Sequence, residues 1–251
     1  RNVVVEEGTG TWCGNCPRGI VGMRMMAEKY GDKFTGIAAH SGDEMEIEGY
    51  APFLNRYIDV AGYPYCTVDR VYSGDPRFDE LEGNYLKEKN VPAIVEVNIV
   101  DTSLDGTDLT INTSARFCIN DYFGEYAWAY AITENNVGPY VQTNYYTAPG
   151  SLDGWDYTEP AVVMDFDDVA VAAYEILGEE GSFPNFVKMD ETYDNSAVVN
   201  VSKVRDWDNA HLIAMVINRK TGFIENSTSC SLSLTGMGGM ETVPSQVSVK
   251  D

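Results

Sequence analysis

Apolar positions in the first ninety residues follow two spacings. Short apolar runs are typical of buried β-strands, and they lie at residues 3–7, 34–39 and 62–70. Between and after these runs, apolar residues recur at helical spacing, which predicts helices over residues 17–30, 52–59 and 77–88. The alternating order of strand and helix predicts an α/β layer over residues 1–90.

The pattern changes near residue 91, after which most segments alternate apolar with polar positions. This alternation is typical of half-buried strands. It predicts short strands at residues 93–100, 109–117, 126–132, 162–166, 186–189, 197–204, 211–217 and 224–232. The stretch 138–160, rich in Gly, Pro, Tyr and Asp, is expected to be a long loop or an inserted excursion. Residues 91–251 are therefore predicted to form an all-β sandwich of immunoglobulin-like type.

The composition fits two ordinary domains and narrows the class of partner. The chain has 251 residues, of which 44% are hydrophobic and 12% aromatic, enough to bury a real core. Its formal net charge of −22 would repel nucleic-acid phosphates and anionic membranes, so we expect no nucleic-acid partner. No apolar run approaches the roughly 18–20 residues that a bilayer-spanning helix needs.

Two of the five cysteines, Cys13 and Cys16, form a Cys-x-x-Cys pair between a predicted strand and a predicted helix. The N–H groups and the dipole of a helix N-terminus favour a thiolate at such a position. We therefore expect Cys13 to be an exposed nucleophile that attacks a disulfide, and Cys16 to be the buried resolving thiol. This chemistry needs no bound cofactor, because the electrons come from a partner dithiol.

Two other interpretations of the pair stay open. The pair forms a static structural disulfide in one of them and binds a metal in the other, although zinc would need a second Cys or His pair that the sequence lacks. Cys66 is either a third redox-active thiol or a small buried hydrophobe. Cys118 and Cys230 lie on faces of opposite character in their strands, so we expect them not to pair.

The segment 12–17, Trp-Cys-Gly-Asn-Cys-Pro, is similar to the Trp-Cys-Gly-x-Cys motif of the thioredoxin superfamily, and residues 1–88 resemble that family. The resemblance implies a buried acid six residues before the first cysteine, and Glu7 stands at that offset. It also implies a cis-proline facing the cysteines, for which Pro64 is the candidate. The Tyr63 backbone would then align the substrate beside Trp12.

Each of these assignments has an alternative. Glu7 could be a solvated residue at the end of its strand, or exchange roles with its neighbour Glu6. Pro64 could be an ordinary trans turn proline. His40, at the carboxyl end of a strand, is a candidate for holding substrate or tuning Cys13, and otherwise a hydrogen-bonded surface residue.

The whole chain also resembles the twenty-eight-kilodalton outer-membrane-protein family of Bacteroidetes envelope lipoproteins. The resemblance is carried by residues 6–19, 39–43, 62–64 and 68–70. It implies export, a lipid anchor upstream of Arg1 and a location in the bacterial cell envelope. The chain departs from standard thioredoxins in having Gly-Asn between the cysteines and in lacking their opening strand and helix, which leaves the direction of the redox reaction open.

These patterns predict a thiol–disulfide oxidoreductase of the cell envelope that acts on protein or peptide disulfides, with an envelope dithiol as its electron donor. The rival hypothesis is a non-catalytic binding or structural lipoprotein in which Cys13–Cys16 is a static disulfide. In that case the β-sandwich and the aromatic loop 140–155 would be the working surface.

Overall fold

The fold is mostly β, and the computed structural model describes residues 1–50 and 62–233. The described residues include the helices α1 (Pro17–Tyr30) and α3 (Phe78–Lys89), with short 3₁₀ helices at Gly31–Lys33 and Trp207–Asn209. The strands are β1 (Val3–Thr9), β2 (Phe34–His40), β3 (Tyr65–Val68), β4 (Tyr72–Gly74), β5 (Val95–Asp105), β6 (Asp108–Phe117), β7 (Tyr126–Glu134), β8 (Val137–Thr143), β9 (Ala161–Phe166), β10 (Val169–Tyr174), β11 (Thr192–Asn200), β12 (Ala210–Asn218) and β13 (Ile224–Leu232).

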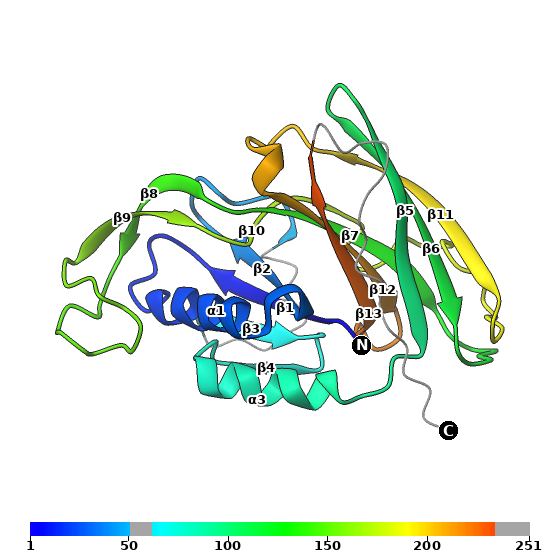
Figure 1. The fold of residues 1–251 in the computed structure, drawn as a ribbon, viewed down its shortest axis with the longest axis horizontal. Helices are drawn as coiled ribbons and strands as arrows, with labels where there is room; N and C mark the ends of the chain where they lie inside the picture. The colour runs from blue at the N-terminus through cyan, green and yellow to red at the C-terminus, as the bar shows by residue number, and fades with distance from the viewer. Residues whose placement is uncertain (51–61, 234–251) are drawn as a thin grey trace.

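An eight-stranded mixed sheet crosses the whole molecule in the order β13-β12-β7-β10-β2-β1-β3-β4 (Figure 1). Strand β1 is parallel to β2 and antiparallel to β3. The two halves of the sheet join where β10 runs parallel to β2, and the backbone N–H of Ala38 donates to the carbonyl of Asp168 at 2.7 Å. The predicted division near residue 90 coincides with the change from alternating helices and strands to a succession of strands. Strands from both sides of this division nevertheless belong to the same eight-stranded sheet.

Apolar cores pack on both faces of the sheet. One of them, which includes Val4, Ile37 and Tyr65, lies on the face of β1 opposite to α1 and α3. Helices α1 and α3 pack on one face of β1 and β3, over a core of Val3, Val5, Met23, Met26, Phe34, Cys66, Val68, Leu81 and Tyr85. At the other end of the sheet, β7, β12 and β13 share a large core with the three-stranded sheet β11-β6-β5. Two antiparallel sheets therefore face each other in the C-terminal half, and β8 and β9 form a separate hairpin beside α1 (Figure 1).

Most predicted elements are present, and the exceptions have local causes. The helix expected at 52–59 lies outside the described residues. The strand expected at 186–189 is only an isolated bridge from Val187 to Asp121, and Phe186 beside it stacks on Tyr122 instead of joining a ladder. The expected long loop 138–160 begins with β8, so the excursion is a hairpin. The short edge strand β4 and strand β10 were not predicted from the sequence.

Candidate functional site

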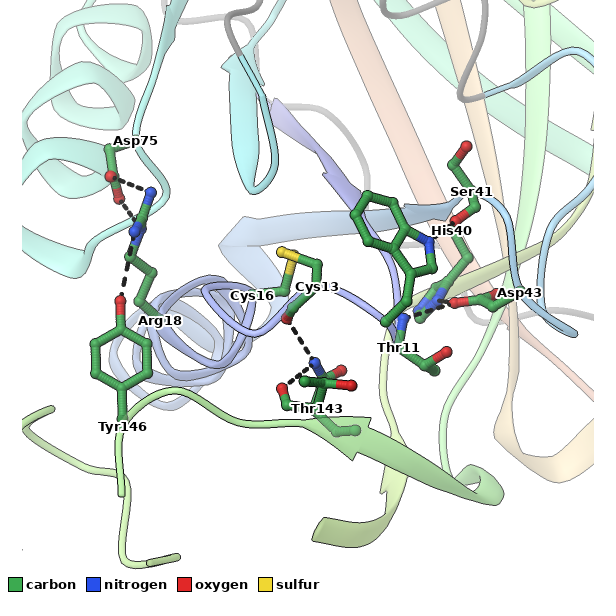
Figure 2. The surroundings of a disulfide bond; sticks show 12 residues. Thr11, Cys13, Cys16, Arg18, His40, Ser41, Asp43, Asp75, Thr143 and Tyr146 are labelled. Atoms are coloured by element: carbon green, nitrogen blue, oxygen red, sulfur yellow. Dashed lines mark hydrogen bonds and ion pairs between the residues drawn. A yellow bond between two sulfur atoms is a disulfide. The ribbon is translucent and has the colours of Figure 1, made fainter. Parts of the chain in front are cut away.

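Cys13 and Cys16 are joined by a disulfide at the junction between β1 and α1 (Figure 2). Their Cα atoms are 5.3 Å apart, and the backbone N–H of Cys16 donates to the carbonyl of Cys13 at 3.0 Å. Cys16 is the N-cap of α1, and Pro17 occupies the first helical position, where its missing N–H costs nothing. The helix N-terminus therefore points at the pair, as a stabilised thiolate requires.

The cysteine pair is less exposed than the sequence indicates. Cys13 was expected to be exposed but is only 5% exposed, and Cys16 is fully buried. One reason is a segment far away in sequence, residues 142–146, which we name the strap. The strap lies against the backbone of the turn and covers its carbonyl side.

Three hydrogen bonds join the strap to this turn. The backbone N–H of Thr143 donates to the carbonyl of Thr11 at 2.7 Å, and that of Tyr145 donates to the carbonyl of Gly14 at 2.9 Å. The side-chain amide of Gln142 donates to the carbonyl of Cys13 at 2.9 Å. Nothing in the local sequence around the cysteines predicts these contacts.

Two aromatic residues lie beside the turn at the same end of the sheet. Trp12 is 52% exposed, contacts Tyr63 edge to face at 5.4 Å, and donates its indole N–H to the carbonyl of Ser41 at 2.6 Å. The Tyr63–Pro64 peptide bond is cis. Gly8 pairs with Tyr65 across β1 and β3, which places the Pro64 turn at the end of the sheet from which the chain runs on to Cys13.

His40 is a buried residue at the end of β2, contrary to the surface alternative. Its Nδ1 lies 2.8 Å from a carboxylate oxygen of Asp43, and the same oxygen accepts the backbone N–H of Thr11 at 2.8 Å. Burial acts to raise the pKa of Asp43, but the hydrogen bond and charge of His40 lower it overall. His40 therefore fixes the chain where it enters the cysteine turn, and it reaches the turn through Asp43 (Figure 2).

Glu7 lies beneath the first turns of α1. A side-chain carbon at Gly19 would come within 1.8 Å of its Oε1 atom, so the carboxyl occupies the space that the glycine leaves. Burial raises the pKa of Glu7 to about 8, with further contributions from the negative charges of Asp168 and Asp75. Its Oε1 atom has no hydrogen-bond partner among the described residues.

Glu6, the neighbour that could exchange roles with Glu7, has different surroundings. Both of its carboxylate oxygens accept hydrogen bonds from Arg70, at 2.7 and 2.8 Å, and the Tyr50 hydroxyl donates to it at 2.9 Å. Glu6 is thus a structural ion-pair residue, and Glu7 is the acid on the side of α1.

A cavity of about 630 Å³ opens between α1, β9 and the start of β10. Glu7, His40 and Asp168 all line it. Burial raises the pKa of Asp168 to about 6, with a contribution from Asp167. The cavity therefore brings two acids that titrate near neutral pH to one space behind the cysteine turn.

The other cysteines show no redox arrangement. Cys66 is buried opposite Glu7 in the ladder, and burial raises the pKa of its thiol, which keeps it unreactive. Cys118 and Cys230 form no disulfide with each other, as expected from their faces. Within residues 1–50 and 62–233, no group of three or more His, Cys, Asp or Glu is placed to hold a metal ion. No helix in the described part of the chain is long and apolar enough to cross a membrane.

Comparison with known proteins identifies the fold. No protein-family model matches the sequence, and no curated protein sequence does so either. A solved structure, HBP35 of Porphyromonas gingivalis, is similar with a TM-score of 0.67 and 17% identity, over 100% of this chain and 81% of HBP35. The protein AGR_C_4864 from Agrobacterium tumefaciens gives a TM-score of 0.49 and 13% identity, over 91% of this chain and 93% of that one. The chain thus shares its fold, over its whole length, with a protein from Bacteroidetes, the group that the sequence resemblance indicates.

Proposed function

We propose that the protein is a thiol–disulfide oxidoreductase of the bacterial cell envelope that acts on protein or peptide disulfides. We also propose that residues 1–90 are a thioredoxin-like unit. The strand order β2-β1-β3-β4 with two helices on one face supports this assignment. We propose as well that the C-terminal half is an immunoglobulin-like sandwich. The two antiparallel layers β13-β12-β7-β10 and β11-β6-β5, which share a core, support this assignment.

The observation that carries the proposal is the position of the pair: a disulfide at a helix N-terminus with Glu7 buried beneath that helix. A structural disulfide does not require a buried acid beneath the same helix, and a buried carboxyl oxygen without a hydrogen-bond partner among the described residues costs free energy. An acid with a pKa of about 8, however, takes up and releases a proton at the pH at which thiols exchange.

In the proposed reaction the reduced pair transfers two electrons to a substrate disulfide. The Cys13 thiolate attacks one substrate sulfur, which forms a mixed disulfide and releases the first substrate thiolate. Cys16 loses its proton, to Glu7 in our proposal, and attacks Cys13. The Cys13–Cys16 disulfide closes, the second substrate thiolate leaves, and the two leaving thiolates take up protons. A dithiol protein of the envelope would reduce the pair again.

The neighbouring residues would hold the substrate. Trp12 and Tyr63 offer a partly exposed aromatic surface beside the pair, and the backbone before Pro64 would align an extended peptide. A disulfide is compatible with an oxidising compartment, which supports export. The lipid anchor upstream of Arg1 rests on the family resemblance alone.

The second candidate function is a non-catalytic envelope protein with a static disulfide. The low exposure of Cys13 favours it, because a substrate has to reach that sulfur. In that case the exchange chemistry would be absent, and the β-rich half would carry the function.

A redox titration of Cys13/Cys16 in defined thiol buffers separates the two. A potential between about −120 and −270 mV is expected for a working oxidoreductase, and one below about −300 mV would mark a structural disulfide. In a peptide-disulfide reduction assay, Cys13→Ser is expected to abolish activity and Cys16→Ser to trap mixed disulfides. Cys118→Ser serves as the matched control and should keep full activity.

A further inference from the structure

Hydrogen bonds hold the strap on both of its sides. Successive backbone N–H groups point in opposite directions: Thr143 and Tyr145 donate to the turn, while Asn144 donates to the carbonyl of Pro160 at 2.9 Å. The buried side chain of Asn144 adds bonds to the carbonyl of Glu159 at 2.8 Å and from the N–H of Tyr146 at 2.8 Å. The strap is therefore anchored to the segment before β9 while its donors face the cysteine turn.

Gln142 is the member of the strap that touches a cysteine directly. It is fully buried, and its amide N–H groups donate to the carbonyls of Cys13 at 2.9 Å and Thr143 at 2.8 Å. Its Oε1 atom is buried and has no partner among the described residues. A buried orphan acceptor is unfavourable, so stability alone gives little reason for glutamine at this position.

The location of these bonds suggests what the amide does. Figure 2 shows the Cys13 carbonyl directed toward Thr143, with the two sulfur atoms on the other side of the turn. The carbonyl oxygen carries partial negative charge and belongs to the same residue as the sulfur that must become a thiolate. A donor on that oxygen withdraws part of this charge and holds the carbonyl away from the sulfur.

We propose that Gln142 is a positioning residue for the Cys13–Cys16 pair: its amide holds the Cys13 carbonyl and thereby makes the pair easier to reduce. This inference rests on the proposed function for its meaning in catalysis. The potential of the pair, however, is measurable whether or not the protein is an enzyme. The β8–β9 hairpin, which supplies the strap, thus tunes the chemistry of a turn about 130 residues before it.

The decisive variant is Gln142→Met, which keeps the length of the side chain and removes both polar atoms. Because the orphan oxygen disappears with the lost donor, its melting temperature should stay near that of the wild type. The pKa of the Cys13 thiol should rise by up to about 1, which lowers the thiolate fraction at pH 7 by roughly two- to tenfold. Glu7, His40, Asp43 and Arg18, the ionisable groups around the turn, are unchanged in this variant.

Two measurements on the full chain test the proposal. The first is the pH dependence of Cys13 alkylation after reduction, and the second is the potential of the pair in glutathione buffers. The potential should become more negative, by up to about 30 mV for a tenfold change in the equilibrium constant. Val141→Ala, at an exposed neighbouring position of β8, is the matched control and should change neither quantity.

The outcomes separate the two proposals. An unchanged pH profile and potential in Gln142→Met would overturn the role of Gln142, whatever the wild-type activity. A shifted potential without reduction of any peptide disulfide would support Gln142 and reject the proposed enzyme. If Gln142→Met does not fold, Gln142→Asn, which keeps the amide but is one methylene too short, should show the same direction of change, and wild-type values there would overturn the proposal.

Discussion

Two adjacent buried glutamates, Glu6 and Glu7, lie on opposite faces of β1 and have different surroundings. Glu6 points to the face where Arg70 and Tyr50 saturate its carboxylate. Glu7 points to the face covered by α1, where no cation pairs with it among residues 1–50 and 62–233 and its pKa is raised to about 8. A buried charge is tolerated when it is paired and becomes protonated when it is not. The same side chain therefore has hydrogen-bond partners on one face and a raised pKa on the other.

The largest expected effect on the free energy of unfolding comes from breaking the ion pair between Arg70 and Glu6. Arg70→Met leaves Glu6 as an uncompensated buried charge, which should cost about 3–5 kcal/mol of the free energy of unfolding. Urea unfolding at pH 7 measures it. Arg18→Met, which removes the partly exposed pair with Asp75, is the matched control and should cost about 1 kcal/mol or less. Equal losses in both variants would mean that burial does not distinguish the two ion pairs.

Removing the Glu7 carboxyl should instead increase the free energy of unfolding. A carboxyl with a raised pKa binds a proton on folding, so the free energy of unfolding falls as the pH rises from about 4.5 to about 8. Glu7→Gln should remove this slope and gain on the order of 3 kcal/mol at pH 8, with little change at pH 4. Unfolding curves between pH 4 and 9 test this. Glu6→Gln should instead destabilise the protein at pH 7, and a gain there would contradict the comparison.

Substitutions of two helical glycines, Gly19 and Gly83, test how tightly the Glu7 carboxyl is packed against α1. Gly19→Ala places a methyl group against the Glu7 carboxyl and should cost about 1–3 kcal/mol. Gly83→Ala, on the exposed face of α3 with open space around it, should instead stabilise the protein by about 0.5–1 kcal/mol. Thermal unfolding of both variants measures the difference. Stabilisation by both would show that Glu7 moves aside freely.

The smallest effect concerns the charge that Asp168 adds to the cavity. Asp168→Asn removes a negative charge near Glu7, so the pKa of Glu7 should fall below about 8, although burial keeps it raised. Carbon NMR of the Glu7 carboxyl during a pH titration measures this shift directly. Asp165→Asn, at another position lining the same cavity, should move the pKa less. A larger shift of the Glu7 pKa in Asp165→Asn would mean that Asp165, and not Asp168, is the charge that interacts with Glu7.

Local sequence was enough to place the cysteine pair. Pro17 after Cys16 and the spacing of the apolar residues that follow predict a helix start, and Figure 2 shows the pair at that start. The cis bond before Pro64 was expected from the resemblance to the thioredoxin superfamily. The register of β3 with β1 brings this bond to the end of the sheet from which the chain runs on to Cys13. Such features depend on neighbours in sequence or on one strand pairing.

The accessibility of the pair could not be predicted in this way. Cys13 was expected to be an exposed nucleophile because it lies just outside a helix N-terminus, but the strap covers one side of its turn. The stretch that contains the strap has a loop-like composition, and no periodicity connects it with residues 11–14. Likewise, the alternation after residue 91 predicts strands but not that β10 pairs with β2 and extends the first sheet.

The sequence by itself determined the chemistry that is available: a Cys-x-x-Cys pair, a helix start beside it and an acid at a fixed offset on the preceding strand. The pair and the helix start follow from spacing, because the period of a strand or helix decides which side chains share a face. The offset of the acid is what the family resemblance implies. Only the tertiary structure decided which glutamate has a partner, how far Cys13 is covered and which donor holds its carbonyl. Those properties depend on desolvation and on contacts between segments far apart in the chain, and no local pattern encodes such contacts.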